Sequence, residues 1–270
     1  MKRTMRFSVF FCALLLAVLT ALPAAAKGAE PALDVSTAGD GYFTVAYQAA
    51  ANTKMKVGIT KDGETQFLTY VPGEEASFAF TRGEGLYTVA LYQNVSGTKY
   101  KAVAKARVQV ELENPMAPYL ASTQEITFSP EDEVGKTAAA LCQGYAQDGD
   151  KAAALCRFMA GNFTYDKELG QKAAAGKVVN YVPDTAATLE SKTGICYDFS
   201  ALYAAMCRSQ GIPCTIVRGY RNGSYHAWNS VYVDGAWHSV DLTWAIANRD
   251  TQAATFADCL APVTGYVAEE

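Results

Sequence analysis

The first half of the chain is built from short runs of β-branched and aromatic residues that are separated by turn-forming residues. The clearest runs are Tyr42–Tyr47, Gly85–Tyr92 and Val103–Val110, and the turn dipeptides between such runs are Asp62-Gly63, Pro72-Gly73 and Ser96-Gly97. Closely spaced strands with no helix between them predict a small all-β sandwich domain over residues 27–112. This segment contains no histidine, no cysteine and no clustered acids. We therefore expect it to be a spacer or a binding module.

The pattern changes after residues 113–123, which contain two prolines close together and are predicted to form a linker. The following sequence is rich in alanine with helical spacing, over Val134–Gln147 and Asp150–Asn162. Asp184 precedes Thr185 as a helix cap would. Cys196 then begins an apolar helical face that ends at Gly211-Ile212-Pro213. No internal repeat is present.

The helix that starts at Cys196 is followed by strand-like sequence. Three segments have strand character, Cys214–Tyr220, Tyr225–Val233 and Ala236–Thr243, with Asn222-Gly223 and Asp234-Gly235 as the turns between them. Helices packed on an antiparallel sheet give an α+β domain, which we place at residues 124–270.

The N-terminus has the features of an export signal. Lys2, Arg3 and Arg6 precede an apolar run from Phe7 to Leu22, and small residues at Ala24-Ala25-Ala26 follow. We expect residues 1–26 to be removed and the mature protein to be secreted or extracytoplasmic. An uncleaved membrane anchor is the alternative, which the short apolar run disfavours.

Charge and cysteine content exclude several classes of function. The chain has 23 basic and 27 acidic residues. Removal of the signal takes away three basic residues, which leaves 20 basic and 27 acidic residues and a net charge of −7. This acidity disfavours nucleic acid as a partner. The six cysteines outside the signal are irregularly spaced, and no two of them form a C-x-x-C motif. We therefore predict neither a disulfide framework nor a metal site. No sequence motif indicates a cofactor. Most of these cysteines are expected to be buried small hydrophobic residues.

Three residues in order along the chain provide a thiol, an imidazole and a carboxylate. Cys196 is predicted at a helix N-terminus, where the helix dipole favours a thiolate and free backbone N–H groups can bind an oxyanion. His226 and Asp241 lie on the two strands of the Asp234-Gly235 hairpin. A nucleophilic cysteine requires a base and an orienting group for that base, and this trio can provide both.

The hairpin register predicts that the base and its orienter meet. If Asp234 and Gly235 form the loop, Val233 pairs with Ala236 and Trp228 faces Asp241. His226 and Asp241 are then diagonal neighbours on one face, about 7 Å apart at Cα. His238 falls on the opposite face and is expected to be a packing or surface residue.

These motifs resemble the bacterial transglutaminase-like superfamily. The resemblance covers roughly the second half of the chain and rests on Gly194–Leu202, Gly211–Cys214, Gly219-Tyr220, His226–Asn229 and Gly235–Trp244, with Asn162–Asp166 upstream. It implies a papain-like fold in which Cys196 is the nucleophile, His226 the general base and acid, and Asp241 the orienter. Two positions depart from the family pattern, Ala245 and the Tyr197-Asp198 pair after the cysteine.

The resemblance implies an exported thiol enzyme that acts on peptide or carboxamide bonds through a thioester. We expect hydrolysis rather than amine transfer, because no tract for a second, amine-binding site is evident. The substrates are expected to be protein, peptide or cell-wall amides, and the membrane is expected to be a partner only through the export signal. A cross-linking transglutaminase and a non-catalytic cell-surface binding protein are the alternatives.

Overall fold

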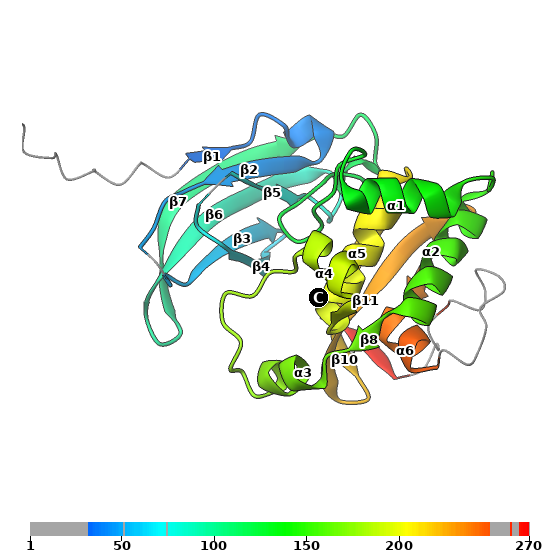
Figure 1. Cartoon of the computed structure of the whole chain (residues 1–270). Coiled ribbons are helices and arrows are strands. Elements are labelled where there is room, and N and C mark those ends of the chain that lie inside the picture. The colour runs from blue at the N-terminus through cyan, green and yellow to red at the C-terminus, as the bar shows by residue number, and fades with distance from the viewer. Residues whose placement is uncertain (1–31, 51, 74, 249–259, 261–264, 270) are drawn as a thin grey trace, which may run out of the picture.

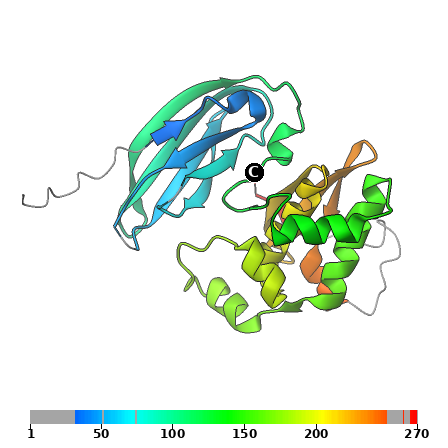
Figure 2. The same cartoon turned by 45° about the horizontal axis from the view of Figure 1, so that its top comes forward.

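The computed structural model describes residues 32–50, 52–73, 75–248, 260 and 265–269. The predicted export signal, with Cys12, lies outside the described residues, as does Cys259. Two bodies are visible, an all-strand one that contains β1–β7 and a mixed one that contains all the α-helices of the described chain (Figures 1 and 2).

The first body is a sandwich of two antiparallel sheets. One sheet has the order β1-β2-β5, and the other has the order β4-β3-β6-β7. The strands are β1 (Ala32–Asp34), β2 (Tyr42–Ala46), β3 (Met55–Lys61), β4 (Glu64–Tyr70), β5 (Ala76–Ala79), β6 (Gly85–Ser96) and β7 (Lys99–Val110), with a 3-10 turn, η1 (Ala38–Asp40), after β1. Phe43, Val57, Phe78 and Val89 are fully buried between the sheets. The predicted all-β sandwich is therefore confirmed.

The second body packs helices against a four-stranded antiparallel sheet of order β12-β11-β10-β13. Its strands are β10 (Cys214–Arg221), β11 (Ser224–Val233), β12 (Ala236–Val240) and β13 (Tyr266–Ala268). Its helices are α1 (Glu133–Cys142), α2 (Asp148–Asn162), α3 (Lys167–Ala174), α4 (Thr185–Ser191), α5 (Cys196–Ser209) and α6 (Leu242–Ala247). Helix α5 is the centre of the core, since Phe199 and Leu202–Cys207 are completely buried.

Three elements differ from the sequence prediction. The first helix ends at Cys142 rather than Gln147. Helix α3 was not predicted from the sequence, and it begins where the Asp166 carboxylate caps it by accepting from the Leu169 N–H at 2.9 Å. The last strand ends at Val240 rather than Thr243, because the Asp241 carboxylate caps helix α6.

The segment between the two bodies is packed against both. It includes a 3-10 turn, η2 (Ala117–Tyr119), in which the Tyr119 hydroxyl donates to the carbonyl of Thr81 at 2.8 Å. The Tyr119 ring lies edge-on to Trp237 of β12 with centroids 4.7 Å apart. Further along, Arg208 of α5 donates to the carbonyl of Ala121. These contacts hold the sandwich beside the helical body.

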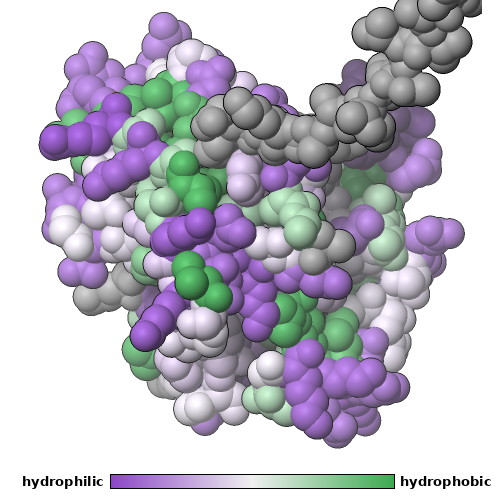
Figure 3. Space-filling view, turned by 90° about the vertical axis from the view of Figure 1, so that its left-hand side faces the viewer, coloured by the Kyte–Doolittle hydropathy of each residue, from purple (hydrophilic) through white to green (hydrophobic). Residues whose placement is uncertain are grey.

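The surface of the molecule is mixed. On the face in Figure 3, hydrophobic side chains form separate patches among hydrophilic ones. Within the part of the chain that the structure describes, no helix has the length and apolar character needed to cross a membrane.

Candidate active site

Cys196 is the first residue of helix α5, as the sequence predicted. The preceding Gly194 lies in the short strand β9 (Thr193–Gly194), which pairs in parallel with β8 (Thr164–Tyr165). A Cβ on Gly194 would lie 2.8 Å from the Cβ of Asp198, so only glycine fits this approach to the helix. The N-cap residue Ile195 provides no side-chain hydrogen bond, which leaves first-turn N–H groups available to a developing oxyanion.

Asp198, in the first turn of α5, stabilises the start of this helix with its side chain. Its carboxylate accepts from the Ile195 N–H at 2.8 Å and from the Tyr181 hydroxyl at 2.7 Å. Burial raises the pKa of Asp198 against the opposing effect of these hydrogen bonds. The Asp198 carboxylate thus links Tyr181 to the start of the helix that begins at Cys196.

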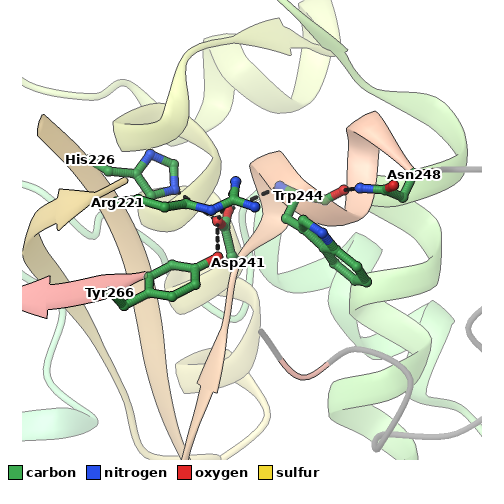
Figure 4. A network of polar contacts seen from close by, with 6 residues as sticks. All are labelled: Arg221, His226, Asp241, Trp244, Asn248 and Tyr266. Carbon is green, nitrogen blue, oxygen red and sulfur yellow. Dashed lines mark hydrogen bonds and ion pairs between the residues drawn. The ribbon is translucent and has the colours of Figure 1, made fainter. Parts of the chain in front are cut away.

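His226 and Asp241 are in direct contact, as the hairpin register predicted. The pairs Val233↔Ala236 and Asn229↔Val240 are as expected for a two-residue loop. Nε2 of His226 lies 2.8 Å from Oδ2 of Asp241 (Figure 4). Cys196 also acts on the His226 ring and raises its pKa, and since Nε2 faces Asp241, Nδ1 is the ring nitrogen left for the thiol. The structure therefore brings all three predicted residues together.

The charge state of His226 follows from these contacts. Burial acts to lower the pKa of His226, but the hydrogen bonds and charges of Asp241 and Cys196 outweigh it and raise that pKa to about 9. Burial likewise acts to raise the pKa of Asp241, yet contact with His226, Tyr266 and the Trp244 N–H lowers it. This environment therefore favours the protonated imidazole beside an ionised Asp241 carboxylate.

Two further residues that the sequence analysis missed contact Asp241. The Tyr266 hydroxyl donates to Oδ2 at 2.7 Å, and an Arg221 guanidinium nitrogen lies 3.4 Å from the same oxygen (Figure 4). Tyr266 reaches the site because β13 pairs with β10, with Arg221 opposite Tyr266. It lies 25 residues beyond Asp241 in the chain. The sequence feature that could have indicated Tyr266 is the three-residue strand Tyr266–Ala268.

His238 lies elsewhere. It is on β12 opposite Val231, and its side chain is partly buried. Asp241 accepts its hydrogen bonds from His226, Tyr266 and the Trp244 N–H. The expected separation of the two histidines by strand alternation is confirmed.

The tryptophans of this region form walls. Trp228 is buried and stacks on the His226 ring, with centroids 6.2 Å apart and planes 20° apart. Its other neighbour is Tyr266, at 5.1 Å between centroids. Trp228 thereby limits how far the imidazole can tilt.

Cys196 and His226 line a cleft of about 730 Å³. One wall belongs to the helical body and includes Tyr181, Tyr197 and Tyr225. The opposite wall is formed by Phe67, Leu68 and Thr69 of strand β4, from the sandwich. The first body, which carries none of the three reactive groups, therefore helps to shape the cleft.

A buried polar cluster lies at the base of this cleft. Glu125 accepts from Arg218 at 2.6 Å and from the Tyr197 hydroxyl, while the Arg218 guanidinium carbon lies 4.9 Å from the centre of the Tyr197 ring. Burial and the neighbouring Glu125 carboxylate hold the pKa of Tyr197 well above its usual value. Tyr197, which follows Cys196 in sequence, is thus anchored to the segment that joins the two bodies.

The remaining cysteines differ from Cys196 in exposure. Cys142, Cys156, Cys207 and Cys214 are buried, as predicted, whereas Cys196 is partly exposed. Burial raises the pKa of Cys142 and holds that of Cys207 well above its usual value. Among the described residues, no group of three His, Cys, Asp or Glu side chains is arranged to hold a metal ion.

Comparison with known proteins agrees with this architecture. Residues 135–242 match the model of the transglutaminase-like superfamily. A helix that presents a cysteine at its N-terminus, packed on an antiparallel sheet, is the papain-like core of that superfamily. The chain therefore carries a transglutaminase-like domain in its second half, as the motifs predicted.

Particular proteins resemble parts or most of the chain. The mouse kyphoscoliosis peptidase is 38% identical over 73 residues, which cover 23% of this chain and 11% of the peptidase, so the chain matches only a small part of that protein's length. A candidate cysteine protease from Cytophaga hutchinsonii is 18% identical, with a TM-score of 0.44 over 84% of this chain and 82% of its own. The periplasmic domain of TgpA from Pseudomonas aeruginosa is 17% identical, with a TM-score of 0.37 over 83% of this chain and 99% of its own.

Proposed function

We propose that the protein is an exported thiol enzyme that attacks peptide or carboxamide bonds through a thioester on Cys196. The observation that supports this most directly is the position of His226, which is hydrogen-bonded to Asp241 and lines the same cleft as Cys196. A thiol, a base and an orienting carboxylate in that order are what covalent thiol catalysis requires.

The reaction would proceed in two halves. The Cys196 thiolate attacks the substrate carbonyl carbon, and the first-turn N–H groups of α5 stabilise the resulting oxyanion. His226 gives its proton to the leaving amine as the C–N bond breaks, which leaves a thioester. The neutral imidazole then takes a proton from water, which attacks the thioester, releases the acid and restores the thiolate and the imidazolium. Asp241 orients the ring throughout.

Hydrolysis is the outcome that we favour over amine transfer. Transfer to an amine requires a second binding site that holds the amine and excludes water. The cleft that contains Cys196 is not enclosed, which gives water access to a thioester there. Protein, peptide or cell-wall amides are the substrate classes proposed, and the export signal is the basis for an extracytoplasmic location.

The first test concerns the nucleophile. Cys196 should react with iodoacetamide near neutral pH much faster than Cys142, Cys156, Cys207 or Cys214, because it alone is partly exposed and beside a base. Mass spectrometry of the alkylated protein measures this. Equal labelling of all cysteines in the folded protein, or turnover by a Cys196→Ala variant, would remove the covalent mechanism.

The second test concerns the acyl acceptor and the rival functions. Glutamine-containing and general peptide libraries are offered with and without a labelled primary amine, and the products are followed by mass spectrometry. Free acids or cleaved peptides are the expected products, whereas predominant amine incorporation would indicate a cross-linking transglutaminase. Peptide retention without any turnover would indicate a non-catalytic binding protein.

A further inference from the structure

Strand β4 is the edge of its sheet, and part of its outward main chain has no partner. The turn Asp62-Gly63 closes the β3–β4 hairpin with Lys61 opposite Glu64. From this hydrogen-bonded pair the ladder alternates, so the N–H and C=O groups of Thr65, Phe67 and Thr69 point away from β3. The Thr69 carbonyl does point outward, since it accepts from the Gln124 side-chain amide at 2.7 Å.

Gln124 also accepts from the Val71 N–H at 3.0 Å, so its side-chain amide occupies one end of the β4 edge in the way a neighbouring peptide group would. Within the described parts of the chain, the outward N–H and C=O groups of Thr65 and Phe67 make no such contact. Unpaired edge groups of this kind are a template for another extended chain.

The free part of β4 lies along a groove that continues from the active site. The cleft that contains Cys196 and His226 shares Phe67, Leu68, Arg218 and Tyr225 with a second hollow of about 610 Å³. That second hollow is lined by Thr65–Leu68 of β4 and by Thr215–Arg218 of β10. From Thr65 to Thr69 the strand spans about 13 Å at a rise of about 3.3 Å per residue, which suits several residues of an extended peptide.

The opposite side of the groove is the edge of β10 before its pairing with β13, where most outward carbonyls have a partner. The pairing of β13 with β10 includes no residue before Gly219. The outward carbonyl of Cys214 accepts from Arg208 at 2.8 Å, and that of Arg218 accepts from the Glu269 N–H at 2.8 Å. By the same alternation Ile216 lies outward between them, and among the described residues its main chain has no partner on that side. Two sheet edges thus face one groove that ends at the nucleophile.

We propose that the substrate is a polypeptide that binds as an extended strand added to the edge of β4, with its reacting residue placed at Cys196. This rests on the proposed function, because it assigns the substrate class of the same site. Main-chain pairing accepts many side chains, so the sandwich acts as a recognition module for extended chains rather than for one sequence. The partly exposed Phe67 ring, 5.8 Å from Tyr92, contributes an apolar contact on the same strand.

The test uses binding rather than turnover, in the Cys196→Ala protein. The probe is a fluorescent nine-residue peptide of serine and threonine around one glutamine, blocked at both ends. Phe67→Pro removes the outward N–H of residue 67, which β3 does not use, and proline is tolerated at such edge positions. Phe67→Ala is the matched control, since it loses the same ring but keeps the N–H. We expect Phe67→Pro to bind the probe about tenfold more weakly than Phe67→Ala.

Peptide N-methylation provides a second measurement that leaves the protein unaltered. Each amide of the probe is methylated in turn, and affinity should fall at alternate positions, because every second N–H of an added strand faces its partner. Equal binding by the two Phe67 variants together with no alternation in the methyl series would overturn the proposal, as would failure of the probe to bind. Iodoacetamide labelling of Cys196 in the otherwise unaltered protein reports on the proposed chemistry separately, so the two ideas can fail independently.

Discussion

Both oxygens of the Asp241 carboxylate accept hydrogen bonds. Oδ1 accepts the Trp244 N–H at 3.0 Å and caps helix α6, while Oδ2 accepts from His226 and Tyr266. One residue therefore follows the end of a strand, caps a helix and holds the His226 ring by a hydrogen bond. This explains why a short capped helix follows the carboxylate at this point in the chain.

Replacing this carboxylate by an amide should separate its structural and catalytic roles. Asp241→Asn keeps an oxygen for the helix cap but allows the wrong imidazole tautomer, so kcat should fall by about 10⁴-fold, as in the comparable serine triad. Steady-state kinetics measure the loss, and thermal unfolding checks the fold. A decrease of less than tenfold would make Asp241 a structural acid.

The raised pKa of His226 predicts a pH-dependent contribution to stability. A pKa that rises on folding from 6.5 to about 9 stabilises the folded state fully below about pH 6.5, and that stabilisation is lost as the pH rises through 9. The difference in Tm between the unaltered protein and a His226→Gln variant should therefore shrink between pH 6.5 and 9. Tm measured across this range tests it, and a difference that grows with pH would show that His226 is neutral in the fold.

At the scale of elements, the β11–β12 hairpin decides which histidine can act. The register puts His226 against Asp241, while His238 pairs with Val231. A shift of one residue would exchange the two faces. The two-residue loop at Asp234-Gly235, both with positive φ, fixes this register.

The two histidines form a matched pair of substitutions on one hairpin. His226→Ala should abolish turnover, because it removes the base, whereas His238→Ala should retain most of it. Turnover of the peptide substrates and the iodoacetamide rate at Cys196 measure both variants. The reverse ranking would contradict the role proposed for His226.

At the scale of the whole molecule, the Glu125–Arg218 pair ties the joining segment to the sheet of the second body. Its N···O distance is 2.6 Å, the same as that of the exposed pair Lys172–Glu168 on α3. The side chains of Glu125 and Arg218 are only 11% and 20% exposed, whereas those of Lys172 and Glu168 are 56% and 79% exposed. Because the two ion pairs have the same N···O distance but different exposure, comparing them isolates the effect of burial on stability.

Glu125→Gln should lower the free energy of unfolding by about 1–3 kcal/mol, because it leaves the Arg218 charge poorly compensated at a largely buried site. Glu168→Gln should leave stability nearly unchanged, since water solvates both partners. Urea unfolding of the two variants tests this. Similar losses in both would show that burial does not set the strength of these pairs.

The sequence by itself determined the local features of this protein. Turn residues and β-branched runs gave the sandwich strands, Asp184 marked the start of α4, and the spacing after Cys196 defined α5. The trio of Cys196, His226 and Asp241 followed from a helix start and a hairpin register. These features depend on residues close together in the chain, where periodicity and turn chemistry are direct physical constraints.

Only the tertiary structure decided what surrounds that trio. Tyr266 reaches Asp241 because β13 adds to β10, and β4 walls the cleft because the joining segment packs against both bodies. The strand that would have continued beyond Asp241 gave way to α6, since the carboxylate could cap a helix there. Such contacts join residues far apart in sequence, and no local pattern encodes them. They arise only when sheets and helices pack and bury their shared surfaces.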